Sequence, residues 1–399
     1  MRSPSDSLMA ARKSQQVDAK EQLELLSKLV AINSVNPDLV PGAPGERKIA
    51  EFVASYLEEF GFEVKLQRTS RNDRPNVIGI LHGSGGGKTL MLNGHLDTVG
   101  VAGMDDPFTP RLKDGKLYGR GAYDMKGGLS SMLLASKLVK QNAPKLRGDL
   151  IVTGVVDEEF ASVGTEEVAK EYHADGGIVL EASDLDIGVA HKGFAWIDVE
   201  TFGKAAHGSM PDLGIDAILS MGEFLTKIEE LEGRLSHSKP HPMLGPGSIH
   251  ACIIQGGREL STYPDHCLVQ LERRTIPGET EDQVAKEIQG IIDDLHGSRG
   301  ERFRASSRIT LFREPWEADK NSAVVKSLSK AILTVSGREG GMTSDSGWMD
   351  SAILDGVGIP CAIFGPGGFG AHGLEEYVNF DEVVECTSIL IETIRNFCA

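Results

Sequence analysis

Apolar residues in the first part of the chain follow two alternating patterns. Ile49, Val53 and Leu57 recur at helical spacing, and Gly61 follows where glycine commonly ends a helix. Short continuous apolar runs lie between such patterns and are typical of buried strands. The expected helices span residues 20–32, 49–60 and 126–139, and the expected strands span residues 76–81, 89–92, 150–156 and 177–180. This alternation favours an α/β fold around a mostly parallel sheet.

The pattern changes near Phe194. Strands are expected at residues 195–201, 248–254 and 268–272, and long amphipathic helices at residues 216–235 and 281–295. This β-α-β-β-α order is typical of a small α+β unit of the ferredoxin-like kind. The α/β pattern then returns, with helices at 323–333 and 381–397 and a strand at 361–364. We therefore expect a catalytic α/β domain in two pieces, residues 19–193 and 305–399, with an inserted α+β domain at residues 194–304.

Charge and cysteine content narrow the class of protein. The net charge is −17, with 58 acidic and 41 basic residues, so we expect neither a nucleic acid nor a membrane as partner. No apolar run is long enough for a transmembrane helix, and the first residues lack the apolar core of a signal peptide. The five cysteines are far apart in the sequence and form no CxxC pair, which favours reduced thiols in a cytoplasmic protein.

The first candidate chemistry is the run GHLDT at residues 94–98, which directly follows an expected strand. Strand ends are where α/β sheets place their ligands. Residues two apart on an extended segment point the same way, so His95 and Asp97 can face one site. Imidazole is a good zinc ligand, and a nearby carboxylate can fix its tautomer. Taken alone, the pair equally fits a strand-end histidine bonded to a neighbour.

Two acidic signals follow. Asp124 lies in the glycine-rich turn GRGAYDMKGG, where glycine lets the backbone approach an ion closely, although an aspartate there also fits a helix cap. The run Asp157-Glu158-Glu159 ends the strand expected at 150–156, and adjacent carboxylates repel one another unless cations or protons intervene. A solvated acidic loop is the alternative in so acidic a chain.

Two more residues complete the set. Glu181 closes the strand at 177–180, and His372 lies in a glycine-rich segment after the strand at 361–364. Five strand-to-helix junctions thus deliver a histidine or a carboxylate to one end of one sheet. Two histidines and three carboxylates suit a pair of divalent metals about 3.5–4 Å apart. A ligand set of nitrogen and oxygen without cysteine favours two Zn²⁺ per subunit, with Co²⁺ or Mn²⁺ as substitutes.

Another glycine-rich run suggests a nucleotide site at first. The segment HGSGGGKT at residues 82–89 resembles a phosphate-binding loop, but His82 stands where that motif needs glycine. An expected strand follows it, not a helix. We therefore interpret the run as a β-hairpin turn and expect no nucleotide there.

Several motifs together resemble a known family. They are GHLDTV, GRGAYDMKGG, DEE, EAS, AHGSMPDLGIDAI, YPDHCLVQLERR and GPGGFGAHGLEEYV, and they run in family order from about Leu23 to the C-terminus. In these motifs the chain is similar to metal-dependent aminoacylases, acetylornithine deacetylases, succinyl-diaminopimelate desuccinylases and glutamate carboxypeptidases, which form a dizinc metallopeptidase family.

The resemblance implies roles at the metal centre. His95 and Glu181 would bind one metal, Glu159 and His372 the other, and Asp124 would bridge the two. It also implies that Asp97 orients His95, that Glu158 is the general base, and that the Asp124–Met125 peptide is cis.

The resemblance also implies how substrate binds. His207 would help hold the tetrahedral intermediate in the active site of a neighbouring subunit, and the inserted domain would serve as lid and dimerisation domain of a homodimer. Arg274 would receive the α-carboxylate of the substrate. Ser261 stands where relatives often carry asparagine. Thr343 lies in a segment, GMTSD, that resembles a substrate loop of the GGTSD kind, with Met342 in place of a small residue. Both departures concern the substrate and not the chemistry.

Three functions remain open on the sequence alone. The first is a deacylase acting on a small N-acyl amino acid, similar to acetylornithine deacetylase. The second is a dipeptidase or a glutamate carboxypeptidase of the same family. The third is a binding protein that kept the fold and lost catalysis, against which the presence of all five ligand positions and Glu158 argues.

Overall fold

The computed structural model describes residues 17–142 and 145–399, and these form two compact units. The first unit contains the chain up to Val189 together with residues 318–343 and 349–399. The second unit contains residues 190–317 and 344–348. Within the described residues, no helix is long and apolar enough to cross a membrane.

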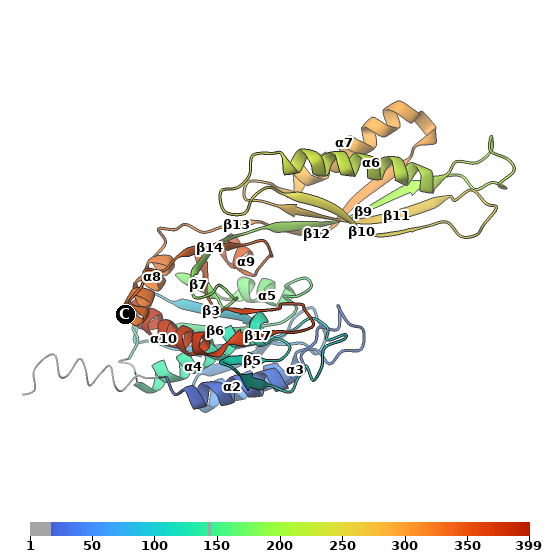
Figure 1. The fold of residues 1–399 in the computed structure, drawn as a ribbon. Coiled ribbons are helices and arrows are strands. Elements are labelled where there is room, and N and C mark those ends of the chain that lie inside the picture. The colour runs from blue at the N-terminus through green and yellow to red at the C-terminus, as the bar shows by residue number, and fades with distance from the viewer. Residues whose placement is uncertain (1–16, 143–144) are drawn as a thin grey trace, which may run out of the picture. The chain divides into compact units, whose positions relative to one another are not determined.

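A large mixed sheet organises the first unit (Figure 1). Its order is β1-β2-β6-β3-β7-β15-β8, with β13 and β14 paired to β8. The bounds are β1 Glu63–Gln67, β2 Asn76–Leu81, β3 Leu90–His95, β6 Leu150–Val155, β7 Gly176–Val179, β8 Ile187–His191, β13 Trp316–Glu317, β14 Met342–Asp345 and β15 Cys361–Ile363. The strands β6, β3, β7 and β15 are parallel, and the pairs β1–β2, β2–β6, β8–β15 and β8–β13 are antiparallel. The expected α/β class is confirmed, and its parallel part is this central group.

Helices flank this sheet. Their bounds are α2 Ala19–Ala31, α3 Arg47–Glu59, α4 Gly127–Asn142, α5 Val163–Glu171, α8 Ala323–Ser336, α9 Ser351–Gly356 and α10 Phe380–Phe397. Helix α4 contacts α2, α3 and α10, whereas α5 and α9 contact each other, and Figure 1 shows β3, β6 and β7 between these groups. Helix α4 begins with small residues for a steric reason, because a Cβ on Gly128 would lie 1.9 Å from the carbonyl oxygen of Leu180. The small residue therefore brings the start of α4 against the end of β7.

A second, smaller sheet of four short strands lies in the first unit and was not expected from the sequence. Its order is β16-β17-β5-β4, with β4 Arg111–Lys113, β5 Lys116–Tyr118, β16 Gly368–Phe369 and β17 Tyr377–Asn379. Tyr377 pairs with Tyr118 across the β17–β5 ladder. Strands of two or three residues carry no readable periodicity, so only the structure shows that the segments after β5 and before β17 are neighbours.

The second unit is an antiparallel sheet covered on one face by two helices (Figure 1). Its strands are β9 Gly193–Phe202, β10 Ser248–Gly256, β11 His266–Thr275 and β12 Ala305–Arg313, in the order β10-β11-β9-β12. The helices α6 Ala217–Ser236 and α7 Glu281–Arg299 bury their apolar faces against the sheet, with Phe224 and Ile288 in the core. The element order matches the ferredoxin-like arrangement expected for the insertion.

Two sequence interpretations need correction. Residues 305–313 were assigned to the returning catalytic segment, but they form β12, which pairs with β9 in the second unit. Three of the nine positions of β12 are exposed and polar and none is fully buried, so its hydrophobic signal is weak. Residues 82–89 do not close a hairpin, because β6 lies between β2 and β3. The amides of Ser84 and Gly85 instead donate to the carbonyls of Leu146 and Arg147.

Candidate metal centre

Three parallel neighbours, β6, β3 and β7, end at the same edge of the large sheet. His95 is the last residue of β3, Glu158 and Glu159 follow β6, and Glu181 follows β7. The carboxyl ends of adjacent parallel strands therefore bring these four side chains together. His95 and Glu181 are buried, with 1% and 6% of their surface exposed.

Asp124 reaches the same place from a short helical turn, η1 (Ala122–Lys126), ahead of α4. The turn begins at Gly121, whose φ of 79° lies in the left-handed region that favours glycine. A Cβ at Gly121 would also lie 2.7 Å from the Thr98 side chain. The Asp124–Met125 peptide is cis.

The two carboxylate oxygens of Asp124 face two different histidines. Oδ1 lies 3.0 Å from Nε2 of His95, and Oδ2 lies 3.4 Å from Nε2 of His372. Nε2 of His95 also lies 3.4 Å from Oε1 of Glu181, and Nε2 of His372 lies 3.0 Å from Oε2 of Glu159. One carboxylate thus stands between two histidine–glutamate pairs, which is the arrangement that a bridging ligand requires.

Potential ligand atoms converge in two overlapping groups. One contains His95, Glu158 and Glu181, and the other contains His95, Asp124 and Glu159, with the ligand atoms of each group within 4.8 Å of one another. His95 belongs to both groups.

Burial and the crowding of carboxylates shift the pKa values of the side chains in this site. Burial and the nearby Glu181 hold the pKa of Glu158 well above its ordinary value, and burial with Asp124 raises the pKa of Glu159 to about 7. Burial opposes protonation of His95, yet Glu181 and Asp124 hold its pKa well above the ordinary value. Hydrogen bonds to Asp124 and Glu159 raise the pKa of His372 to about 10.

The donor set fits a pair of divalent cations. Oε1 of Glu159 is buried and has no hydrogen-bond partner among the described residues, so one lone-pair site faces the cluster without a proton donor. Burial is the largest cause that raises the pKa values of Glu158, Glu159 and Glu181, and neighbouring carboxylates raise them further, so a bound cation would favour the charged form of all three. Nitrogen and oxygen donors of this kind suit Zn²⁺, Co²⁺ or Mn²⁺.

Asp97 supports the strand-end side of the cluster. Nδ1 of His95 lies 3.0 Å from the backbone oxygen of Asp97 and 3.5 Å from its Oδ1. The Asp97 carboxylate accepts hydrogen bonds from the backbone amides of Glu158 and Glu159, both at 3.2 Å. Asp97 therefore holds both the histidine and the turn that carries the two glutamates.

Sequence reasoning missed several supporting residues. Nδ2 of Asn36 donates to Asp97 at 2.8 Å and to Asp157 at 3.1 Å, which ties the ends of β3 and β6 together. Arg120 and Glu376 form a buried ion pair of 2.7 Å beside Asp124. Both lie inside motifs that the sequence analysis quoted, GRGAYDMKGG and GPGGFGAHGLEEYV, so a charged residue within each motif was the available signal.

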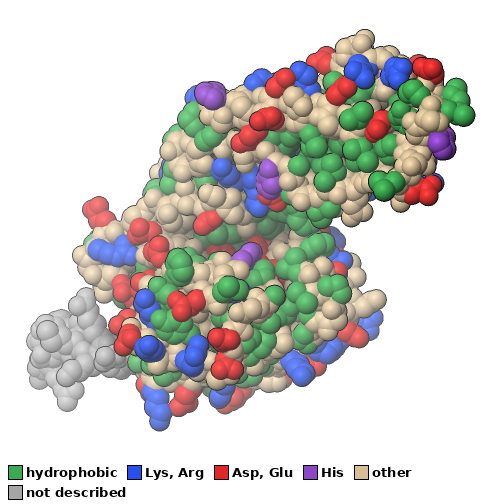
Figure 2. Space-filling model, turned by 45° about the vertical axis from the view of Figure 1, so that its right-hand side comes forward, with side chains coloured by type: hydrophobic (Ala, Val, Ile, Leu, Met, Phe, Trp, Pro, Cys, Tyr) green, Lys and Arg blue, Asp and Glu red, His purple; other side chains and the backbone are tan. Residues whose placement is uncertain are grey.

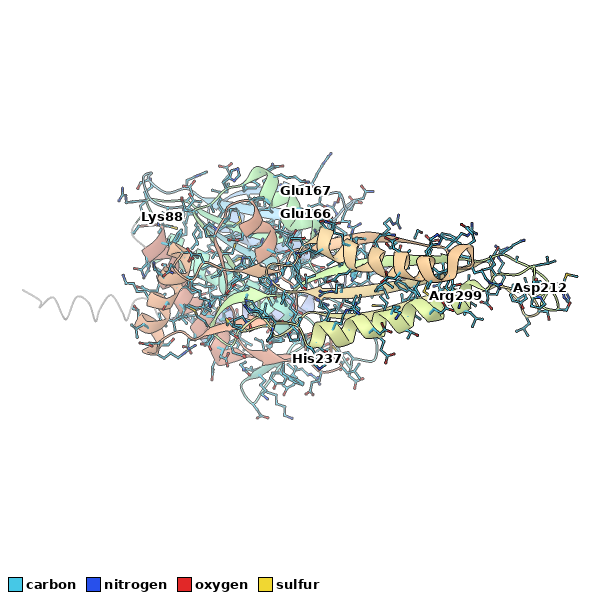
Figure 3. All side chains as sticks on the ribbon, turned by 90° about the horizontal axis from the view of Figure 1, so that it is seen from above. Lys88, Glu166, Glu167, Asp212, His237 and Arg299 are labelled. Atoms are coloured by element: carbon cyan, nitrogen blue, oxygen red, sulfur yellow. The ribbon has the colours of Figure 1, made fainter. Side chains whose placement is uncertain are left out.

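The expected substrate residues are divided between the two units. In the second unit, the exposed His207 lies beside Ser261, because the amide of Gly208 donates to the carbonyl of Ser261 at 2.7 Å. Figure 3 shows the segment that carries Asp212, in the same connection as His207, projecting past the ends of α6 and α7. Arg274 is near the other end of β11, and Thr343 lies in β14 of the first unit.

Comparison with known proteins places this geometry in a family. The family described as "Peptidase family M20/M25/M40" matches residues 91–396. The chain belongs to this family. It is 34% identical to the N-formyl-4-amino-5-aminomethyl-2-methylpyrimidine deformylase of Bacillus subtilis, over 95% of each chain. It is 29% identical to the acetylornithine deacetylase of Myxococcus xanthus, over 94% of this chain and 96% of that one.

The fold also matches solved peptidase structures. A tripeptidase from Staphylococcus aureus has a TM-score of 0.78 with 20% sequence identity, over 96% of this chain and 99% of that chain. The family expected from the motifs and the assignment of the chain as an amide hydrolase are thereby confirmed.

Proposed function

We propose that this M20 hydrolase uses two divalent metals, most suitably Zn²⁺, to remove a small acyl group from an N-acyl amino acid. The observation that carries the proposal is Asp124, whose two oxygens face His95 and His372 separately. In this proposal His95 and Glu181 hold one metal and Glu159 and His372 hold the other. When bound, the metals polarise the amide carbonyl and lower the pKa of water.

Glu158 is the proposed general base. Burial and the neighbouring Glu181 raise its pKa, which makes its carboxylate a better proton acceptor than an exposed glutamate. The water oxygen attacks the carbonyl carbon while the Glu158 carboxylate takes a proton from that water. Glu158 then gives this proton to the leaving nitrogen as the carbon–nitrogen bond breaks. The products are a carboxylic acid and an amine.

Arg274 is the proposed site for the substrate carboxylate. Its Nε donates to Glu272 at 2.8 Å, and its guanidinium carbon lies 5.3 Å from the centre of the Phe194 ring. These two contacts fix the plane of the group, while its two terminal nitrogens have no hydrogen-bond partner in the described part of the chain. A planar guanidinium held in this way suits bidentate binding of a carboxylate. We assign supporting substrate contacts to Ser261 and Thr343.

A second substrate class has a specific observation in its favour. The Bacillus subtilis relative, at 34% identity, is named for removing a formyl group from an aminomethylpyrimidine, which has no α-carboxylate. The acetylornithine deacetylase, at 29% identity, favours the amino acid instead. Both names describe loss of a short acyl group from a primary amine, so the two candidates differ in the amine and in whether the acyl group is formyl or acetyl. A dipeptidase or glutamate carboxypeptidase is the remaining alternative.

We further propose that the protein is a cytoplasmic homodimer joined through the β10 face, meaning Ile218, Leu219, Ile253 and Ile254. Strand β10 is an edge of its sheet, and Ile253 and Ile254 are 50% and 53% exposed. Leu219 of α6 is 69% exposed, and hydrophobic side chains are visible on the surface of this unit in Figure 2. A long edge strand with apolar side chains is a template for pairing with another strand. His207 would then act at the oxyanion in the site of the other subunit.

The deciding experiment is a substrate panel. Chelator-treated protein, with and without added Zn²⁺ or Co²⁺, is assayed for amine release from N-acetyl, N-formyl and N-succinyl amino acids, from the formylated aminomethylpyrimidine and from dipeptides. We expect metal-dependent release from the N-acyl amino acids, reduced by Arg274→Met mainly through KM. If only the formylated pyrimidine is hydrolysed, and Arg274→Met leaves its KM unchanged, that compound replaces the N-acyl amino acid as the proposed substrate. No release from any compound by metal-loaded protein would contradict the proposed activity.

A further inference from the structure

Glu376 is a buried carboxylate whose hydrogen bonds all go to one loop. Only 1% of its surface is exposed. Its Oε1 accepts from the backbone amides of Tyr123 and Asp124, at 2.9 and 3.1 Å. Its Oε2 accepts from the amide of Gly121 at 2.9 Å and from Nη1 of Arg120 at 2.7 Å. The carboxylate therefore holds residues 120–124 by four hydrogen bonds, one from the Arg120 side chain and three from backbone amides, including that of Asp124.

Arg120 extends this connection to a second loop. Its Nη2 donates to the carbonyl oxygen of Gly373 at 2.8 Å, directly after His372. The backbone oxygen of Glu376 also accepts from the amide of Gly119, and β5 pairs with β17 next to these residues. The ion pair thus joins residues 119–124 to residues 373–376. Arg120 is only 3% exposed, so water competes little for these bonds.

The two joined loops carry the parts of the centre that strand ends do not hold. Asp124 lies in a turn, and the His372 side chain is 58% exposed with a backbone φ of 61°. Among the described residues, the polar contacts of the His372 ring are those with the carboxylates of Asp124 and Glu159. By contrast, His95 and Glu181 are positioned by β3 and β7.

We propose that Arg120 and Glu376 act as a positioning pair that fixes the separation between Asp124 and His372. This pair thereby sets the affinity for the metal that His372 and Glu159 hold. Neither residue is among the proposed metal ligands or substrate contacts, and both act through the backbone of the loops that carry Asp124 and His372. The inference rests on the proposed dinuclear centre, and it goes beyond that centre by naming what holds its loop-borne half together.

The test is a metal titration of Glu376→Gln. Glutamine keeps the size of the side chain but replaces one acceptor oxygen with an NH₂ group, which must then face N–H donors of the loop. We expect the first metal to bind as in the unaltered protein and the affinity for the second to fall about 10- to 100-fold, the range found for residues that support metal ligands. The readouts are binding isotherms with Zn²⁺ and the visible spectrum of the Co²⁺ form, neither of which depends on turnover.

Two further variants keep the test decisive. Arg120→Lys preserves the charge but can bond either Glu376 or Gly373 and not both, so it should lower the second affinity by less than Glu376→Gln. Glu279→Gln is the matched control, because Glu279 also accepts from a buried arginine, Arg273, at 2.6 Å and from the backbone amide of Ile276. It lies in the second unit and should leave both metal affinities unchanged.

The outcomes separate this inference from the proposed function. If Glu376→Gln and Arg120→Lys bind two metals as tightly as the unaltered protein while their melting temperatures fall, the pair is merely structural and the inference is wrong. If Glu376→Gln fails to fold, Arg120→Lys alone carries the same comparison. If the unaltered protein binds no second metal, it is the proposed dinuclear centre that fails.

Discussion

The candidate metal centre has two halves that are built differently. His95, Glu158, Glu159 and Glu181 directly follow or end three adjacent parallel strands, and Asp97 and Asn36 fasten the strand ends together. Asp124 and His372 lie on loops joined by Arg120, Glu376 and a sheet of very short strands. The strand-end half is positioned by the core of the sheet. The loop-borne half depends on a few buried polar contacts, so it is the half more sensitive to single substitutions outside the ligand set.

The largest expected effect is on the catalytic step and does not depend on how either half of the metal centre is held. Glu158→Gln keeps the shape of the site but removes the proton acceptor, so kcat should fall about 10²- to 10⁴-fold. Two metals should remain bound, as measured by elemental analysis alongside turnover of the best substrate. Glu167→Gln, on α5 of the same unit and ion-paired with Lys170, should be unchanged. Turnover close to normal in Glu158→Gln would remove Glu158 from its role.

The next prediction contrasts one histidine from each half. His372→Ala removes an exposed proposed ligand and should abolish tight binding of one metal. It also removes the ion pairs with Asp124 and Glu159, so the melting temperature of the metal-free protein should fall, but by less than in His95→Ala. His95→Ala removes a fully buried side chain next to both pairs, so it should weaken both metals and lower that melting temperature as well. Metal titration and differential scanning calorimetry measure the two quantities. Equal metal affinities and equal melting temperatures for the two variants would contradict the proposed difference between the halves.

A third prediction tests the fastening of the strand-end half. Asn36→Ala removes the donor that joins Asp97 and Asp157 and leaves both buried carboxylates with one partner fewer. The free energy of unfolding of the metal-free protein should fall by about 1–3 kcal/mol, measured by urea denaturation. Asn396→Ala removes a single bond to Glu392 on a helix and serves as control, with a smaller expected loss. Equal losses would show that Asn36 does no more than an ordinary polar residue.

The smallest expected effect is a pH dependence that involves both halves. In the metal-free protein the pKa of Glu159 is raised to about 7 and that of His372 to about 10. Each group then binds more protons in the folded than in the unfolded state, so its contribution to stability decreases as pH rises. For Glu159 this occurs from about pH 4 to 7, and for His372 from about pH 6.5 to 10.

The melting temperature of the metal-free protein should therefore fall between pH 5 and pH 9. Saturating Zn²⁺ should remove this decline, because bound cations replace the protons. Thermal unfolding monitored by circular dichroism at several pH values measures both curves. A decline of equal size with and without Zn²⁺ would show that these groups do not face a metal.

The difference between the halves also explains what the sequence could predict. His95, Glu159 and Glu181 could be predicted because each lies at the end of a short continuous apolar run, and parallel strands bring their ends together. The sequence analysis brought Asp124 and His372 to one end of the sheet. Nothing in local periodicity showed that their loops are joined through β5 and β17, because these strands have three residues each. Arg120 and Glu376 escaped notice because a buried ion pair between residues 256 positions apart leaves no local pattern. Strand β12 was missed for a related reason, because its polar positions hide its place in a sheet.

The central claim is that Asp124 joins two metal sites, and metal stoichiometry tests it most directly. Metal-free protein is titrated with Zn²⁺ by calorimetry, and the bound metal per chain is counted after gel filtration for the unaltered protein and for Asp124→Asn. The account predicts two metals per chain in the unaltered protein and a marked loss of affinity for both in Asp124→Asn. A single metal per chain, or two metals bound equally well by Asp124→Asn, would contradict it.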